Sequence, residues 1–131
     1  WLFQYRAYIV KPEMQTGITL GRLYHGGTIV CDSPAVIYYS QLSPYLFHST
    51  DELIWYRNTW NKSQLRNWFT QNQVRYLVWQ NTTYSGTWWL FPELSRGENY
   101  PADGVRYLIE HARIYRFLDR LVITYIYRIS Y

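Results

Sequence analysis

The chain contains little cysteine, lysine or charge. Cys31 is its single cysteine, so no disulfide can form within the 131 residues, and a small disulfide-held secreted scaffold is disfavoured. Charged residues make up 17%, below the ~25% of an average globular protein. No apolar run approaches a membrane span, so we expect a soluble protein. Trp1 follows no initiator methionine or signal segment, which predicts a processed or trimmed N-terminus.

Residues that would hold a metal ion or a nucleotide do not cluster. The histidines His25, His48 and His111 lie far apart, and no spacing fits a zinc site. Gly26-Gly27 opens no helix, and there is no Walker or Gly-x-Gly-x-x-Gly pattern. We therefore predict no metal, no cofactor and no catalytic residues.

One nucleophile and base are nevertheless near each other in sequence. Six residues of strand separate His25 from Cys31 by about 20 Å, so the two can meet only if Gly26-Gly27 folds the chain back. Free cysteine is more often a small buried residue, and we expect Cys31 to lie in the core.

Aromatic residues and arginine are in excess. Aromatics make up 21% of the chain, with 15 tyrosines and 7 tryptophans. The formal net charge is +4, and Lys11 and Lys62 are the only lysines among 13 basic residues. Tyrosine, tryptophan and arginine are enriched at protein interfaces, and arginine also binds carboxylates and phosphates. This composition favours a contact surface for a protein or an anionic partner.

The length predicts a single domain over residues 1–131. Alternating apolar and polar residues predict strands, at 1–10, 18–24, 74–80 and 123–131. Shorter β-type runs are expected at 28–31, 35–39 and 88–91, the last as the partner of 74–80. The last strand should pair with the central sheet, with a neighbouring subunit as the alternative.

Helical periodicity appears in two regions. Ser49 and Glu52 have capping-box spacing and open one or two shorter helices at about 50–71. Leu108, Ala112 and Tyr115 recur at helical intervals, which predicts one long C-terminal amphipathic helix at about 101–120. The predicted fold class is α+β, with a mixed, mainly antiparallel sheet.

Aromatic and basic residues interleave most densely at 55–62, 66–69 and 75–79. Such rings and guanidinium groups can anchor a protein interface, bind single-stranded nucleic acid or stack on the sugars of a glycan. The predicted binding residues are Trp55, Arg57, Trp60, Arg66, Trp68, Arg75 and Trp79.

Residues 23–30, which run Leu-Tyr-His-Gly-Gly-Thr-Ile-Val, resemble the first-strand signature of the BTB/tetramerisation fold. Residues 43–46 follow at a suitable distance, and 108–115 with Leu118, Leu121 and Val122 look like its late helix. The acidic-Arg-acidic motif that this family carries after its middle strand is missing at 80–81. The resemblance implies a self-assembling adaptor without catalysis.

The same glycine pair also resembles part of another family. Residues 22–27, 37–39 and 74–79 are similar to the His, Tyr and Glu strands of ADP-ribosyltransferases. That resemblance implies that His25 and Tyr39 hold NAD in a degenerate enzyme, because Arg75 stands where the catalytic glutamate belongs.

We expect a non-catalytic protein-interaction or assembly module that forms a subunit of a larger complex. The aromatic and arginine-rich surface would bind another protein or a second copy of this chain. Single-stranded nucleic acid and glycan are the alternative partners.

Overall fold

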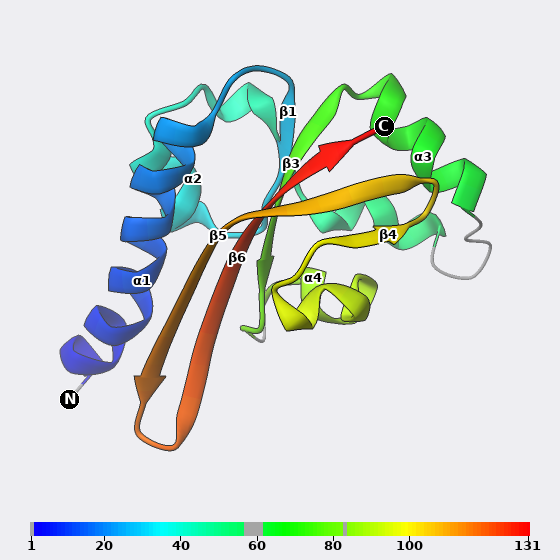
Figure 1. Cartoon of the computed structure of the whole chain (residues 1–131). Coiled ribbons are helices and arrows are strands. Elements are labelled where there is room, and N and C mark those ends of the chain that lie inside the picture. The colour runs from blue at the N-terminus through cyan, green and yellow to red at the C-terminus, as the bar shows by residue number, and fades with distance from the viewer. Residues whose placement is uncertain (1, 57–61, 83) are drawn as a thin grey trace.

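The computed structural model describes residues 2–56, 62–82 and 84–131 and shows an α+β fold in three layers (Figure 1). A six-stranded mixed sheet forms the middle layer. Helices α1 (Leu2–Leu23) and α2 (Pro34–Ser40) cover one face, and α3 (Lys62–Gln71) and α4 (Thr87–Leu90) lie on the other. The 3-10 helices are η1 (Pro44–Leu46), η2 (Thr50–Tyr56) and η3 (Pro92–Arg96).

The sheet has a parallel half and an antiparallel half. Its strand order is β2-β1-β3-β6-β5-β4, in which β2, β1 and β3 run parallel and β6, β5 and β4 pair antiparallel. The chain passes from β1 to β2 on one side and then to β3 on the other side of β1. The strands are β1 (Thr28–Val30), β2 (Phe47–His48), β3 (Val74–Gln80), β4 (Tyr100–Ala102), β5 (Val105–Phe117) and β6 (Arg120–Ser130).

The face under α1 and α2 is packed closely. Leu20 of α1 and Val36 of α2 are buried against Val78 and Ile126 of the sheet. A Cβ atom on Gly17 would lie 2.6 Å from the Val36 carbonyl oxygen, so the glycine lets the two helices approach. None of the described helices is long and apolar enough to cross a membrane.

The opposite face is aromatic, and its buried polar atoms are paired. Phe69 of α3 contacts Phe91 and Tyr107, with ring centroids 6.5 and 6.3 Å away. Trp79 Nε1 donates to the Phe91 carbonyl oxygen at 3.0 Å, and the Tyr127 hydroxyl donates to the Leu94 carbonyl oxygen at 2.6 Å. These bonds let large amphipathic rings be buried without an unpaired donor.

The α+β class, the mixed sheet and the strand at 74–80 are confirmed. The C-terminal strand is also confirmed, because β6 pairs with β3 at the centre of the sheet. The region 50–71 contains η2 and α3 on either side of residues that lie outside the description.

The long C-terminal helix predicted at about 101–120 is wrong, because 105–117 is strand β5 and 120–130 is β6. The apolar residues that suggested a helix do not follow the buried face. Ile114 is 58% exposed, whereas Arg113 is half-buried and donates to Gln15 Oε1 at 2.6 Å. Gln15 on α1 is a polar partner that allows the Arg113 guanidinium to lie on the inner side of the strand. A register shift at Glu110 also interrupts the pairing of β5 with β6. The BTB resemblance implied a late helix at 108–115, but these residues lie in strand β5.

Four predicted strands are helices. Residues 1–10 and 18–24 belong largely to α1, 35–39 to α2 and 88–91 mostly to α4. Gly17, directly before the range predicted as a strand at 18–24, is a contact point of α1 with α2. For α2, Ser33 is an N-cap that accepts the Val36 N–H, and Pro34 follows at the first turn.

The hairpin can be tested by engineered disulfides. Ile114 and Ile123 are Cα partners across β5 and β6, so Ile114→Cys with Ile123→Cys should oxidise readily. In a continuous helix the two would lie about 13 Å apart, too far for a bond. The measurement is thiol counting by mass spectrometry.

Ile114→Cys with Leu118→Cys is the matched pair. It would be about 6 Å apart in a helix. In the hairpin, Leu118 follows the last residue of β5, and three residues of strand already separate it from Ile114 by roughly 10 Å, so the pair should stay reduced. Rapid oxidation of this pair in place of the first would show that 101–120 is helical after all.

Candidate functional site

The carboxyl ends of the parallel strands meet beside an open groove. After β1 the chain first adds β2 on one side of it and then β3 on the other side. In α/β sheets, ligands bind where the strand order reverses in this way, beyond the carboxyl ends of the strands. Here Cys31 and Asp32 follow β1 and Ser49 follows β2.

We call this hollow the tyrosine groove. Its volume is about 540 Å³, and most of its lining is apolar. Tyr38 on α2 is 75% exposed, and Tyr45, beside Pro44 in η1, is 94% exposed. The lining residues are Cys31, Asp32, Pro34, Ile37, Tyr38, Leu42, Pro44, Phe47 and Ser49.

A smaller acidic pocket of about 230 Å³ adjoins the groove at Asp32 and Ser49. Its rings are Tyr84 and Trp89, and its charged residues are Asp32 and Asp51. Among the described residues, neither hollow has a lysine or arginine in its lining. The combined surface therefore favours a cationic or neutral ligand over a phosphate.

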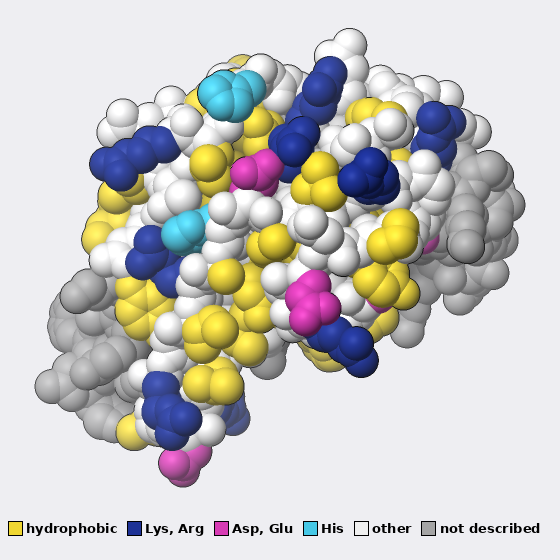
Figure 2. Space-filling model, in the orientation of Figure 1, with side chains coloured by type: hydrophobic (Ala, Val, Ile, Leu, Met, Phe, Trp, Pro, Cys, Tyr) yellow, Lys and Arg dark blue, Asp and Glu magenta, His cyan; other side chains and the backbone are white. Residues whose placement is uncertain are grey.

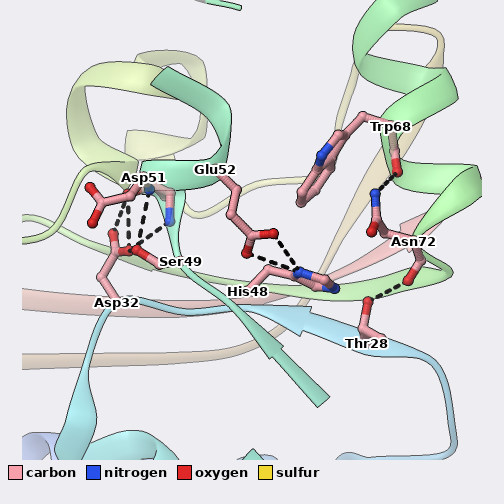
Figure 3. Close-up of polar contacts among 9 residues, drawn as sticks. Thr28, Asp32, His48, Ser49, Asp51, Glu52, Trp68 and Asn72 are labelled. Atoms are coloured by element: carbon pink, nitrogen blue, oxygen red, sulfur yellow. Dashed lines mark hydrogen bonds and ion pairs between the residues drawn. The ribbon is translucent and has the colours of Figure 1, made fainter. Parts of the chain in front are cut away.

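Asp32 connects three segments at this edge (Figure 3). Its Oδ1 accepts the Thr50 N–H at 2.8 Å and the Ser49 hydroxyl at 3.2 Å. Its Oδ2 accepts the Gly86 N–H at 2.7 Å and the Ser85 hydroxyl at 3.2 Å. The carboxylate thereby fixes the end of β1, the start of η2 and the loop before α4.

A second carboxylate, that of Glu13, lies on the buried face of α1. Glu13 is 4% exposed and accepts the Ser33 hydroxyl at 2.7 Å and Gln80 Nε2 at 3.4 Å. Burial raises the pKa of Glu13, and these two hydrogen bonds offset part of the rise. Gln80 Oε1 and the Thr16 and Thr124 hydroxyls are buried without a hydrogen-bond partner among the described residues.

Cys31 and His25 do not form a nucleophile–base pair. Cys31 lies after β1 and His25 before it, so the intervening strand separates them. Burial raises the pKa of the Cys31 thiol to about 12, which keeps it protonated and unreactive at neutral pH. Cys31 is buried, as expected. Tyr39, which the NAD-binding resemblance pairs with His25, lies near the end of α2, where it packs against α1 at Gly17.

His48 has a carboxylate partner but no nucleophile. Its Nδ1 lies 3.0 and 3.1 Å from the two Glu52 carboxylate oxygens, and its ring packs edge-on against Trp68 at 5.4 Å (Figure 3). No hydroxyl or thiol of the described residues hydrogen-bonds to His48. The pair orients the imidazole, and the arrangement lacks the third group that nucleophilic catalysis requires.

The predicted binding residues do not form one surface. Trp79 is 3% exposed and stacks on Tyr125 in the core. Trp68 is half-buried, and Arg66 and Arg75 are exposed. Burial raises the pKa of Tyr131, and the positive charges of Arg75 and Arg66 offset part of that rise. Arg57 and Trp60 lie outside the described residues, and of Trp55 only the backbone, in η2, is described.

The tyrosine groove was missed from sequence. Two signals pointed to it: Asp32 directly after a short apolar strand, and the Ser33-Pro34 helix start that places Tyr38 on α2. The sequence pattern instead suggested that residues 32–34 join two strands, at 28–31 and 35–39.

Among the described residues, no group of three or more His, Cys, Asp or Glu side chains could hold a metal ion. Comparison with protein families, curated proteins and solved structures found no match to this chain.

Replacing Asp32 by asparagine should destabilise the fold. Each carboxylate oxygen accepts a backbone N–H, from Thr50 or Gly86, so an amide nitrogen in either orientation meets a donor. We expect Asp32→Asn to lower the free energy of unfolding by about 2 kcal/mol, measured in urea. Asp51→Asn removes the same charge from an exposed side chain and should change it by less than about 0.5 kcal/mol. Equal losses would contradict the role of Asp32 as a connector.

Glu13 should make the fold more stable in mild acid. Its pKa is raised in the folded state above the ~4.3 of an unfolded glutamate, so the folded chain binds the proton more tightly. The resulting stabilisation is complete below the unfolded pKa and is lost as pH rises through the folded pKa. Glu13→Gln should reduce this pH dependence and stabilise the fold at pH 7 by on the order of 1 kcal/mol.

The measurement is urea unfolding at a series of pH values. A glutamine at 13 can also donate to Gln80 Oε1, which has no partner now. Glu93, whose pKa burial also raises, should leave a residual slope. Glu98→Gln changes an exposed carboxylate and should keep the full slope; an unchanged slope in Glu13→Gln would refute the prediction.

Proposed function

We propose that the domain is a non-catalytic protein-interaction module whose tyrosine groove binds a segment of another protein. The segment would carry one aromatic or aliphatic anchor next to a lysine or arginine. The observation that carries this proposal is the near-complete exposure of Tyr38 and Tyr45 beside an apolar groove.

The apolar lining supports an apolar anchor. Ile37, Leu42 and Phe47 line the hollow with two prolines, and burying a side chain of leucine size there removes apolar surface from water on both partners. No hydrogen bond of the described residues uses the Tyr38 or Tyr45 hydroxyl. Both rings can therefore contact a partner without breaking an internal bond, which suits interface tyrosines.

The charges support a cation beside that anchor. Asp32 and Asp51 stand at the polar end, and neither hollow contains a basic residue to neutralise them. Asp51 is exposed, so it is the carboxylate that a partner reaches first. Complementary charge of this kind sets specificity and association rate more than affinity.

The chemistry of the site supports binding over catalysis. The thiol in the groove is protonated at neutral pH, and the Asp32 oxygens are occupied by internal donors. The described residues offer no base aligned with a nucleophile.

A phage-displayed library of random heptapeptides tests the proposal. We expect selection on the full chain to enrich peptides with an aromatic or aliphatic residue next to Lys or Arg. The Tyr38→Ser/Tyr45→Ser double variant should bind the selected peptides at least about tenfold more weakly. Asp51→Asn should weaken binding about threefold. Fluorescence anisotropy measures both.

Tyr100→Ser, at an exposed tyrosine on edge strand β4, is the control and should bind normally. No enrichment, enrichment of acidic peptides or equal binding by the double variant would reject the proposal. A dimer in sedimentation equilibrium that the double variant abolishes would assign the groove to a second copy instead.

A further inference from the structure

A third hollow lies at the amino ends of β1 and β3, at the opposite end of β1 from the tyrosine groove. Its volume is about 370 Å³. Figure 2 shows basic side chains gathered along the upper part of this face, near the loop that joins α1 to β1. The lining residues are Leu23, His25, Gly26, Arg75, Tyr76, Glu110 and Arg128.

The loop that forms one wall is fixed to the sheet by two tyrosines. The Tyr76 hydroxyl accepts the His25 N–H at 3.1 Å and donates to the Leu23 carbonyl oxygen at 3.0 Å. The Tyr24 hydroxyl donates to the Gly27 carbonyl oxygen at 2.9 Å. The wall is therefore in place before a ligand arrives, which reduces the entropy cost of binding.

Two arginines, Arg75 and Arg128, line this hollow with bonding capacity to spare. Arg128 uses Nε to bind Glu110 at 2.7 Å, which orients the guanidinium and leaves its two terminal nitrogens available. The Arg75 guanidinium makes no ion pair or hydrogen bond among the described residues. The Arg75 stem crosses the loop at Gly27, where a Cβ atom would lie 2.1 Å from Arg75 Cγ. Counting Glu110, the two arginines leave one positive charge in excess.

The glycine pair adds backbone donors. Gly26 and Gly27 have φ values of 123° and 79°, and no hydrogen bond in the described part of the chain uses either N–H. Backbone amides in a turn can bind an anion, and Gly26 is the member of this pair that lines the hollow.

From these features we propose that the hollow binds a phosphate monoester, in a site separate from the tyrosine groove. A phosphate presents three acceptor oxygens and ≈ −1.5 to −2 charge at pH 7, enough to bond Arg75, Arg128 and a loop amide together. A carboxylate has two oxygens and one charge, and Glu110 already supplies that group to Arg128. The hollow exceeds the size of a bare phosphate, so it also accommodates an organic substituent.

The test uses inorganic phosphate, phenyl phosphate and benzoate at constant ionic strength, followed by amide chemical shifts of the ¹⁵N-labelled chain. Phenyl phosphate should bind saturably and tightest, with shifts centred on Gly26 and Gly27. Arg75→Gln, at an exposed side chain, should weaken binding about tenfold. Glu110→Gln should tighten binding several-fold, because it frees Arg128 and removes a like charge.

Arg96→Gln removes the same charge from the exposed end of η3 and should change affinity by less than about twofold. Equal loss in Arg75→Gln and Arg96→Gln, or no saturable shift, would overturn the site. Benzoate binding as tightly as phenyl phosphate would overturn the preference for phosphate. Inorganic phosphate binding as tightly as phenyl phosphate would overturn the monoester.

Discussion

Asp32 holds the parallel half of the sheet and its surface loops in one arrangement. Its two oxygens accept backbone N–H groups of Thr50 and Gly86, which are 36 residues apart in sequence and belong to different layers of connections. A carboxylate can accept from both sides at once, whereas an amide cannot. The position of η2, and with it one wall of the acidic pocket, depends on this one side chain. The groove follows, because Asp32 and Ser49 belong to both hollows.

Opposite ends of the short strand β1 differ in charge. Beyond its carboxyl end the described lining of the hollows includes aspartates and no basic residue, and before its amino end two arginines line a third hollow. Three residues of strand separate the two environments. The two proposed ligands, a cationic segment and a phosphate monoester, would each meet the complementary charge at its own end of β1. The overall charge of +4 hides this separation.

The sequence predicted elements whose apolar pattern coincides with burial. Val74–Gln80 is buried at six of its seven positions, and it was found. β5 was mistaken for a helix because its inward positions include Arg113, which donates to Gln15 of α1, while Ile114 faces outward. The residue that pairs with Arg113 comes from a helix about 100 residues away in sequence. The pattern of neighbouring residues around Arg113 therefore cannot reveal it. For the site, interleaved rings and arginines gave exposed Arg66 and Arg75 but also Trp79, because composition does not distinguish a core ring from a surface one.

The aromatic excess divides into two groups that differ in what their polar atoms do. Tyr107, Tyr127 and Trp79 are buried, and each donates to a neighbouring loop: to Asp103, to the Leu94 carbonyl oxygen and to the Phe91 carbonyl oxygen. These rings fill the core and attach the loops around it, so their number reflects folding. Tyr38 and Tyr45 make no such bond in the described chain and are exposed. Tyr38 lines the tyrosine groove, and Tyr45 follows Pro44, another lining residue. Exposed rings next to an apolar hollow are what the proposed partner would cover.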